Sequence, residues 1–171
     1  MGYVQNNLLH DEHIISWTRP HWIVYGPSVL LFFFALILTG YLPSALNALS
    51  GFHLFGMSIH HFIVLAVFII AIFYGIKALI MHQTSEYSIT DKRIMMKTGW
   101  IQRRSIEIFL DKVEAIYVDQ SVTGRIFDYG TIIIVGTGGS KDPFLFVPKP
   151  LMFRKQAQEQ IDSDEERRRR Y

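Results

Sequence analysis

Five basic side chains in the second half of the chain have the residue types and the spacing for binding anions. Lys92, Arg93 and Lys97 flank a predicted hairpin, and Arg103 and Arg104 follow in the next predicted strand. Guanidinium and ammonium groups bind phosphate and carboxylate oxygens through charge and hydrogen bonds. We therefore expect these residues to contact lipid headgroups or a membrane surface. The alternative is that they only present a general positive charge to anionic lipid, without a specific headgroup pocket.

The seven histidines do not have the spacing of a metal or haem site. His60 and His61 are adjacent, so on a helix their side chains point about 100° apart. His21 lies at the inner end of the first apolar run and His60 and His61 lie at the outer end of the second, so within a membrane hairpin they are about 30 Å apart. We therefore expect no metal, haem or other cofactor.

The sequence also lacks the common catalytic motifs. It has no Gly-x-Ser-x-Gly turn, no His-Glu-x-x-His motif and no P-loop. Residues 136–140 resemble a phosphate loop only in their glycines, because the Lys-Ser/Thr ending is absent and a strand follows; a hairpin loop is predicted. The chain has no cysteine, which excludes disulfides, thiolate metal sites and thiol nucleophiles within it. The prediction is a non-enzymatic protein with no evident small-molecule substrate.

Charge divides the 171 residues into two unlike parts. Up to His82 the formally charged residues are Asp11, Glu12, Arg19 and Lys77, and all the others follow. The boundary therefore lies near residues 83–85, between an apolar part and a part typical of a soluble β domain. The net charge of +2 is too small for a dedicated nucleic-acid-binding protein.

The apolar part contains two long runs, residues 22–42 and residues 59–81. A helix of either length spans about 30 Å, the thickness of the hydrocarbon core of a bilayer. Because both runs are apolar on all sides, they predict a transmembrane hairpin over residues 22–82 rather than buried helices of a soluble protein. Aromatic rings and a lysine near the run ends are predicted interface anchors. These anchors are Trp22, Tyr25, Tyr41 and Lys77.

Lysine and arginine near the spans predict the orientation of the hairpin. The loop of residues 43–56 has neither residue type, whereas Arg19, Lys77, Lys92 and Arg93 lie at the outer flanks. The positive-inside rule then places both termini in the cytoplasm and the loop outside. The first run is expected to remain as a signal anchor. Small residues along both runs are compatible with a homo-oligomer or another membrane protein as partner.

The soluble part reads as short strands separated by turns, followed by one helix. The predicted strands are residues 86–90, 93–97, 100–109, 113–119, 131–135 and 144–148, with residues 124–129 as a possible further short strand. Residues 151–161 are predicted to be helical, with Phe153, Ala157 and Ile161 on one face that could cover an open barrel end. The charged tail, residues 162–171, is predicted to be disordered.

Several stretches resemble bacterial pleckstrin-homology-like membrane proteins of the YdbS/YdbT type. The opening hairpin carries the resemblance most clearly, with Tyr87, Ile89, Thr90 and Arg93 followed by Gly99. The match continues through residues 110–113, 118–121 and 124–130, through Gly138 and Gly139, and through the helix around Phe153. The lead-in from Glu12 to Trp22 is similar to the segment that precedes the first span in that family. No short motif is specific alone, but their order and the two apolar runs are similar throughout.

The resemblance implies a cytoplasmic PH-like domain over residues 83–161, after an N-terminal lead-in of residues 1–21. Its expected fold is α+β, a bent antiparallel β-barrel capped by a C-terminal helix. It implies a bacterial cytoplasmic (inner) membrane protein of uncharacterised activity, because one fold hosts many functions.

The expected function is a non-enzymatic integral membrane protein that presents its PH-like domain as a protein-interaction or assembly module. The alternative is sensing of anionic lipid headgroups by the first hairpin, where eukaryotic PH domains hold basic residues. A less favoured alternative is an accessory subunit of a transporter, because the spans have no ionisable residue at mid-depth.

Overall fold

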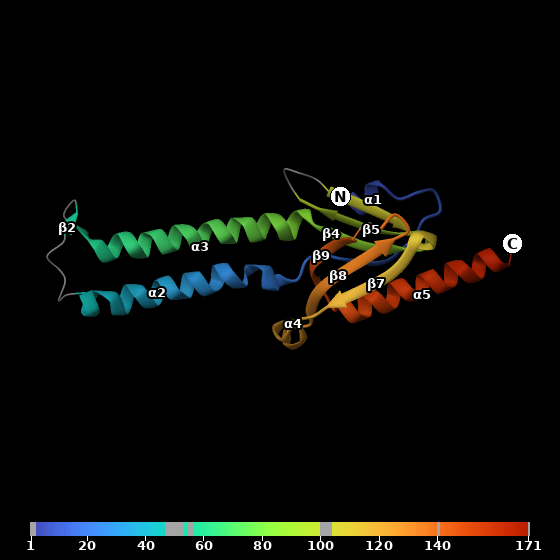
Figure 1. The fold of residues 1–171 in the computed structure, drawn as a ribbon. Coiled ribbons are helices and arrows are strands. Elements are labelled where there is room, and N and C mark those ends of the chain that lie inside the picture. The colour runs from blue at the N-terminus through green and yellow to red at the C-terminus, as the bar shows by residue number, and fades with distance from the viewer. Residues whose placement is uncertain (1–2, 47–52, 55–56, 100–103, 140, 171) are drawn as a thin grey trace. The chain divides into compact units, whose positions relative to one another are not determined.

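The fold comes from a computed structural model that describes residues 3–46, 53–54, 57–99, 104–139 and 141–170 (Figure 1). The side chains of residues 41–60 and of residue 142 are outside this description. The chain divides into two compact units. Residues 24–79 form a helical unit, and residues 1–23 together with residues 80–171 form a mixed unit, which we call the PH-like unit.

The helical unit is a pair of long apolar helices, α2 (Gly26–Leu46) and α3 (Ile59–Thr84), that lie side by side (Figure 1). A short 3-10 turn, Trp22–Tyr25, precedes α2. The strands β2 (His53–Leu54) and β3 (Met57–Ser58) pair between the helices.

Small residues allow α2 and α3 to approach closely. A Cβ added to Gly75 would lie 3.7 Å from the Cβ of Ser28, and Ala35 and Ala71 are buried. Segments of α2 and α3, with the preceding turn, are long and apolar enough to cross a membrane, by length and composition. These candidate spans are Trp22–Gly40 and His61–Thr84. The first lies within the predicted run of residues 22–42, and the second overlaps the predicted run of residues 59–81.

The PH-like unit contains a four-stranded antiparallel sheet with the strand order β1-β4-β5-β6. Its strands are β1 (Ile14–Thr18), β4 (Glu86–Thr90), β5 (Arg93–Thr98) and β6 (Arg104–Phe109). The strands β4, β5 and β6 match predicted strands. The strand matched by β6 was predicted to begin at residue 100, and its first residues lie outside the described part of the chain. The fourth, β1, comes from the N-terminal lead-in, which precedes the two long helices. A helical turn, α1 (Tyr3–Asn6), lies before it.

The second sheet has three antiparallel strands in the order β7-β8-β9 and is followed by the C-terminal helix. The elements are β7 (Val113–Asp119), β8 (Tyr129–Gly136), β9 (Lys141–Pro148) and α5 (Pro150–Arg169). The buried Phe153 and Ala157 of α5 pack into the core, and Ile161 packs against it. This confirms the predicted apolar face. The rest of the core comes from both sheets and from Leu110, which lies between them in sequence. The sheet residues are Tyr87, Ile89, Ile94, Met96, Ile132, Ile134, Phe144 and Val147.

The two sheets do not close into the predicted barrel. Within the described residues, no strand of one sheet pairs with a strand of the other. A 3-10 turn, Leu110–Lys112, separates β6 from β7, and buried Leu110 turns the chain from one sheet to the other. The antiparallel sheets and the C-terminal helix of a PH-like domain are present. Barrel closure depends on strand register, and the number of strands alone does not predict that register.

Residues 124–129 are not a strand, because a short helix, α4 (Val122–Phe127), occupies most of them. The side chain of Ser121 caps this helix by accepting a hydrogen bond from the Gly124 amide at 3.1 Å. Asp128 ends it in the left-handed conformation, with φ of 55°. Only glycine fits at position 124, since an added Cβ would lie 2.6 Å from the Tyr129 carbonyl oxygen.

The charged tail is helical in the structure rather than disordered, because α5 continues to Arg169. Pairs four residues apart support this extension, including Arg168 to Asp164 at 2.9 Å and Arg169 to Glu165 at 3.4 Å. Arg168 also lies 3.2 Å from Asp111, which connects the extension to the turn between the sheets. Counting apolar residues misses such a helix because charge pairs, not burial, stabilise it.

Candidate functional site

Arg93, the middle of the predicted basic hairpin, is buried at the start of β5 with 5% of its surface exposed. Its Nε and Nη2 atoms donate to the two carboxylate oxygens of Glu12, both at 2.9 Å. Nη2 also donates to the Asn7 carbonyl at 2.6 Å, and Nη1 donates to Glu107 at 2.5 Å. The paired contact with Glu12 is the two-bond geometry in which guanidinium and carboxylate groups interact most strongly.

Glu12 is enclosed as completely as its partner. Its side chain is fully buried, and it also accepts hydrogen bonds from the Leu9 amide at 2.6 Å and the Thr90 hydroxyl at 2.7 Å. Burial alone would raise the pKa of the Glu12 carboxyl, but the hydrogen bonds from Arg93, Leu9 and Thr90 outweigh it and lower that pKa. The hydrogen bond to Glu12 raises the pKa of Arg93. Both groups are therefore charged at neutral pH.

Other contacts hold the same N-terminal segment, residues 3–18, against the hairpin. The ammonium of Lys92 donates to the His10 carbonyl at 2.9 Å, and that of Lys97 lies 5.0 Å from the centre of the Tyr3 ring. The Tyr3 hydroxyl donates to Glu107 at 3.2 Å. With β1 paired along β4, these contacts make the N-terminal segment part of the PH-like unit.

The five predicted anion-binding residues have different positions. Lys92, Arg93 and Lys97 converge on the N-terminal segment. Arg104 begins β6, opposite Thr98, with an exposed side chain, and Arg103 is outside the described residues. Because four of the five N–H groups of Arg93 bind this chain's own oxygens, a headgroup contact by Arg93 would require the N-terminal segment to leave.

The predicted interface anchors lie at both ends of the long helices. Trp22 and Tyr25 are in the turn before α2, and Trp22 is exposed. Lys77 is an exposed residue of α3. Tyr41 belongs to α2, but the structure does not describe its side chain.

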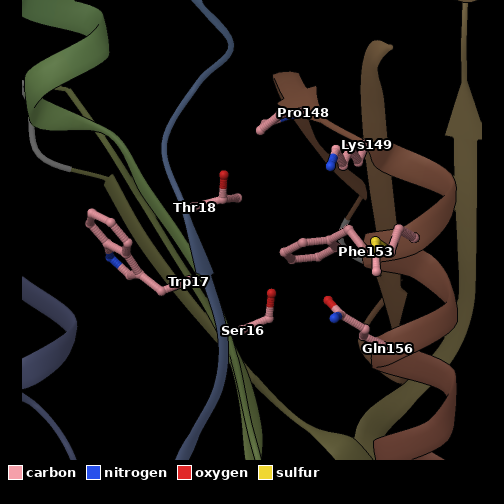
Figure 2. A pocket seen from close by; sticks show the side chains of 8 residues that line it. Ser16, Trp17, Thr18, Pro148, Lys149, Phe153 and Gln156 are labelled. Carbon is pink, nitrogen blue, oxygen red and sulfur yellow. The ribbon is translucent and has the colours of Figure 1, made fainter.

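A groove of about 320 Å³ lies between β1 and the start of α5. In Figure 2, Ser16 and Thr18 of β1 point toward Phe153 and Gln156 of α5, whereas Trp17 points to the opposite side of the strand. β1 is an edge strand, so one row of its backbone groups faces away from β4. The groove therefore combines apolar side chains with backbone donors and acceptors. The groove was not predicted because β1 was not, although Ile14, Ile15 and Trp17 favour strands.

Lowering the pH should weaken the attachment of the N-terminal segment. The ordinary pKa of a glutamate side chain is about 4.3. Because folding lowers the pKa of Glu12, the contribution of Glu12 to stability is complete above that pH and is lost as the pH falls through the lowered pKa. We expect the melting temperature of the full-length protein in detergent to fall less steeply over this acidic range in Glu12→Gln than in the unmodified protein. Equal pH dependence of the two proteins would contradict this assignment.

Within the described part of the chain, no cluster of three or more His, Cys, Asp or Glu side chains could hold a metal ion. Comparison with known families gives a positive result. The model of a bacterial PH domain matches residues 30–161, from within α2 to within α5. No curated protein and no solved structure matches the chain. Domains with a PH-like fold commonly mediate protein or lipid interactions and are typically non-catalytic. The match excludes Glu12 and β1, so this chain adds an N-terminal strand to the matched region. Because the match covers well over half of the 171 residues, this chain belongs to the bacterial PH domain family.

Proposed function

We propose that this protein is a membrane-anchored, non-enzymatic interaction module of the YdbS/YdbT type. In this proposal α2 and α3 cross the bacterial cytoplasmic membrane, with both termini in the cytoplasm. The PH-like unit then recruits or assembles proteins at the inner surface. The partner is a second copy of the chain or another membrane protein.

The membrane part of the proposal rests on the surface of the two helices. Large apolar side chains are exposed along both, such as Leu30, Phe33, Leu65, Ile69 and Phe73. Water does not favour so long an apolar surface, whereas lipid tails do. The positions of Arg19, Lys77 and Lys92 support the cytoplasmic orientation of the flanks.

The observation that supports protein binding is the groove beside β1. An extended protein segment can add to an open sheet edge through backbone hydrogen bonds, while pockets beside the edge select its side chains. The edge of β1 and the apolar Met152 and Phe153 offer both elements. The basic hairpin is less suited to a headgroup, because Arg93 is already bound by Glu12 and Glu107.

The groove is tested by placing a photo-crosslinking amino acid at Gln156, which lines it. Gln158 is the matched control, since it is an exposed glutamine of the same helix about 200° away. After irradiation of living cells, we expect a discrete protein adduct from position 156 and none from position 158. Equal adducts at both positions, or no adduct at 156, would reject the groove as the interaction site. Adducts to lipid alone at 156 would mean that lipid, not protein, occupies the groove, and would also reject it as the protein-interaction site.

The proposed topology is tested with single cysteines, because the chain has none of its own. A membrane-impermeant maleimide should label Ser50→Cys in spheroplasts and Gly138→Cys only after permeabilisation. Labelling of both sites in intact spheroplasts, or of neither before permeabilisation, would contradict the proposed topology.

A further inference from the structure

The short helix α4 presents an apolar surface that nothing described in the PH-like unit covers. The exposed fractions of Val122, Ile126 and Phe127 are 76%, 71% and 45%. Trp22, 58% exposed, meets Phe127 edge to face with ring centres 5.9 Å apart. We call these four residues the α4 patch. Clusters of exposed large apolar side chains mark interaction surfaces more often than single ones do.

Hydrogen bonds and ring contacts fix the position of the α4 patch. Ser121 caps α4, and the Lys149 amide donates to the Asp128 carbonyl at 2.8 Å, which connects the end of α4 to the start of α5. His21 stacks on Tyr129 with ring centres 5.5 Å apart and places Trp22 beside Phe127. The His21 amide also donates to the Phe146 carbonyl at 2.6 Å. These contacts preform the patch.

The covalent position of Trp22 indicates what covers the patch. Trp22 is the first residue of the candidate span Trp22–Gly40, so α4 contacts the residue at which the chain enters that span. Tryptophan favours the boundary between headgroups and hydrocarbon tails. If Trp22 lies at that boundary, Phe127 must lie within one ring contact of it.

We propose that the α4 patch inserts into the headgroup–tail boundary of the leaflet in which the first span begins, with a lipid surface as its partner. This inference rests on the proposed membrane anchoring. Exposed Arg125 lies between the apolar residues of α4 and is placed to bind anionic headgroups. Asp128, exposed at the end of α4, adds one carboxylate near the same surface. The patch gives the PH-like unit a second attachment to the membrane beside its two covalent connections, and this attachment restricts its orientation.

The test uses the absence of cysteine from the full-length chain. Ile126→Cys, with Val122→Cys as a second site, is labelled with an environment-sensitive fluorophore. The protein is reconstituted in phosphatidylcholine–phosphatidylglycerol vesicles containing lipids with a nitroxide high on the acyl chain. Gly138→Cys is the matched control because an added Cβ there meets nothing within 4 Å, and it lies beyond the opposite end of β8. Ile69→Cys in α3 marks the proposed span.

We expect a blue-shifted emission and strong nitroxide quenching at Ile126 and Val122, and neither at Gly138. If Ile69 is quenched while Ile126 and Val122 emit as Gly138 does, the inference fails and the proposed anchoring stands. A blue shift without quenching at Ile126 and Val122 would mean that protein covers the patch, which also overturns the inference. If Ile69 is not quenched, the proposed anchoring and this inference both fail.

Discussion

Replacing Glu12 with alanine is expected to destabilise the PH-like unit by about 3–5 kcal/mol, because it leaves the buried Arg93 without its main partner. The amide of Leu9 and the hydroxyl of Thr90 lose their acceptor in the same substitution. Glu107 remains beside Arg93, but it cannot replace both oxygens of Glu12. The measurement is the free energy of unfolding of the full-length protein in detergent micelles, followed by near-ultraviolet circular dichroism.

The neighbouring residue provides the control. The exposed Asp11 lies 3.6 Å from the exposed His10, and Asn can adopt the left-handed backbone conformation of position 11, with φ of 59°. Asp11→Asn should therefore change stability by less than about 0.5 kcal/mol. Combining Glu12→Leu with Arg93→Met should recover much of the loss, because an apolar pair leaves no buried charge. A loss for Glu12→Ala no larger than that of Asp11→Asn would show that the ion pair does not stabilise the unit.

Truncation of Phe153 to alanine should have a comparable effect, about 3–5 kcal/mol, because it opens a cavity in the core. Phe153 is 3% exposed and belongs to the core formed by both sheets and α5. The same unfolding measurement reports the loss. Met152→Ala is the control, since Met152 is the preceding residue of the same helix and is 56% exposed, so its truncation should cost less than about 0.5 kcal/mol. Equal losses for the two variants would mean that α5 does not pack on the sheets as described.

Glu12→Ala and Phe153→Ala measure separately how much the N-terminal segment and the matched region contribute to stability. The matched residues 30–161 include Phe153 but not Glu12. A large effect at position 12 would show that the PH-like unit of this chain depends on a segment that precedes its two long helices. A domain boundary drawn after α3 would then remove part of the fold.

Local pattern was sufficient for the elements that are defined by composition or periodicity. The two apolar runs predicted α2 and α3, and short segments of β-forming residues between turns predicted β4, β5 and β7. The apolar spacing in α5 predicted its buried face, including Phe153 and Ala157. Each of these signals lies within one segment of chain, so no distant contact is needed to recognise it.

The errors occurred where particular contacts, near or far along the chain, override the local residue pattern. Residues 124–129 contain strand-forming types, but the cap at Ser121 and the turn at Asp128 make α4 a helix. Arg93 has the charge of a surface residue, but Glu12, 81 residues earlier, makes it a buried one. Such ion pairs need both partners to lose water together, and only the folded chain brings them together.

The amino-acid sequence by itself determined an almost uncharged helical part, a β-rich part with a C-terminal helix, and the order in which they occur. These features can be recognised from the sequence because the periodicity and the length of each apolar run lie within one segment of the chain. The tertiary structure alone decided that the N-terminal segment completes a sheet as β1, that the sheets stay open, and that the basic hairpin binds this chain's own carboxylates. Those features depend on the register and burial of groups far apart in sequence, whose free energies exist only once the chain has folded.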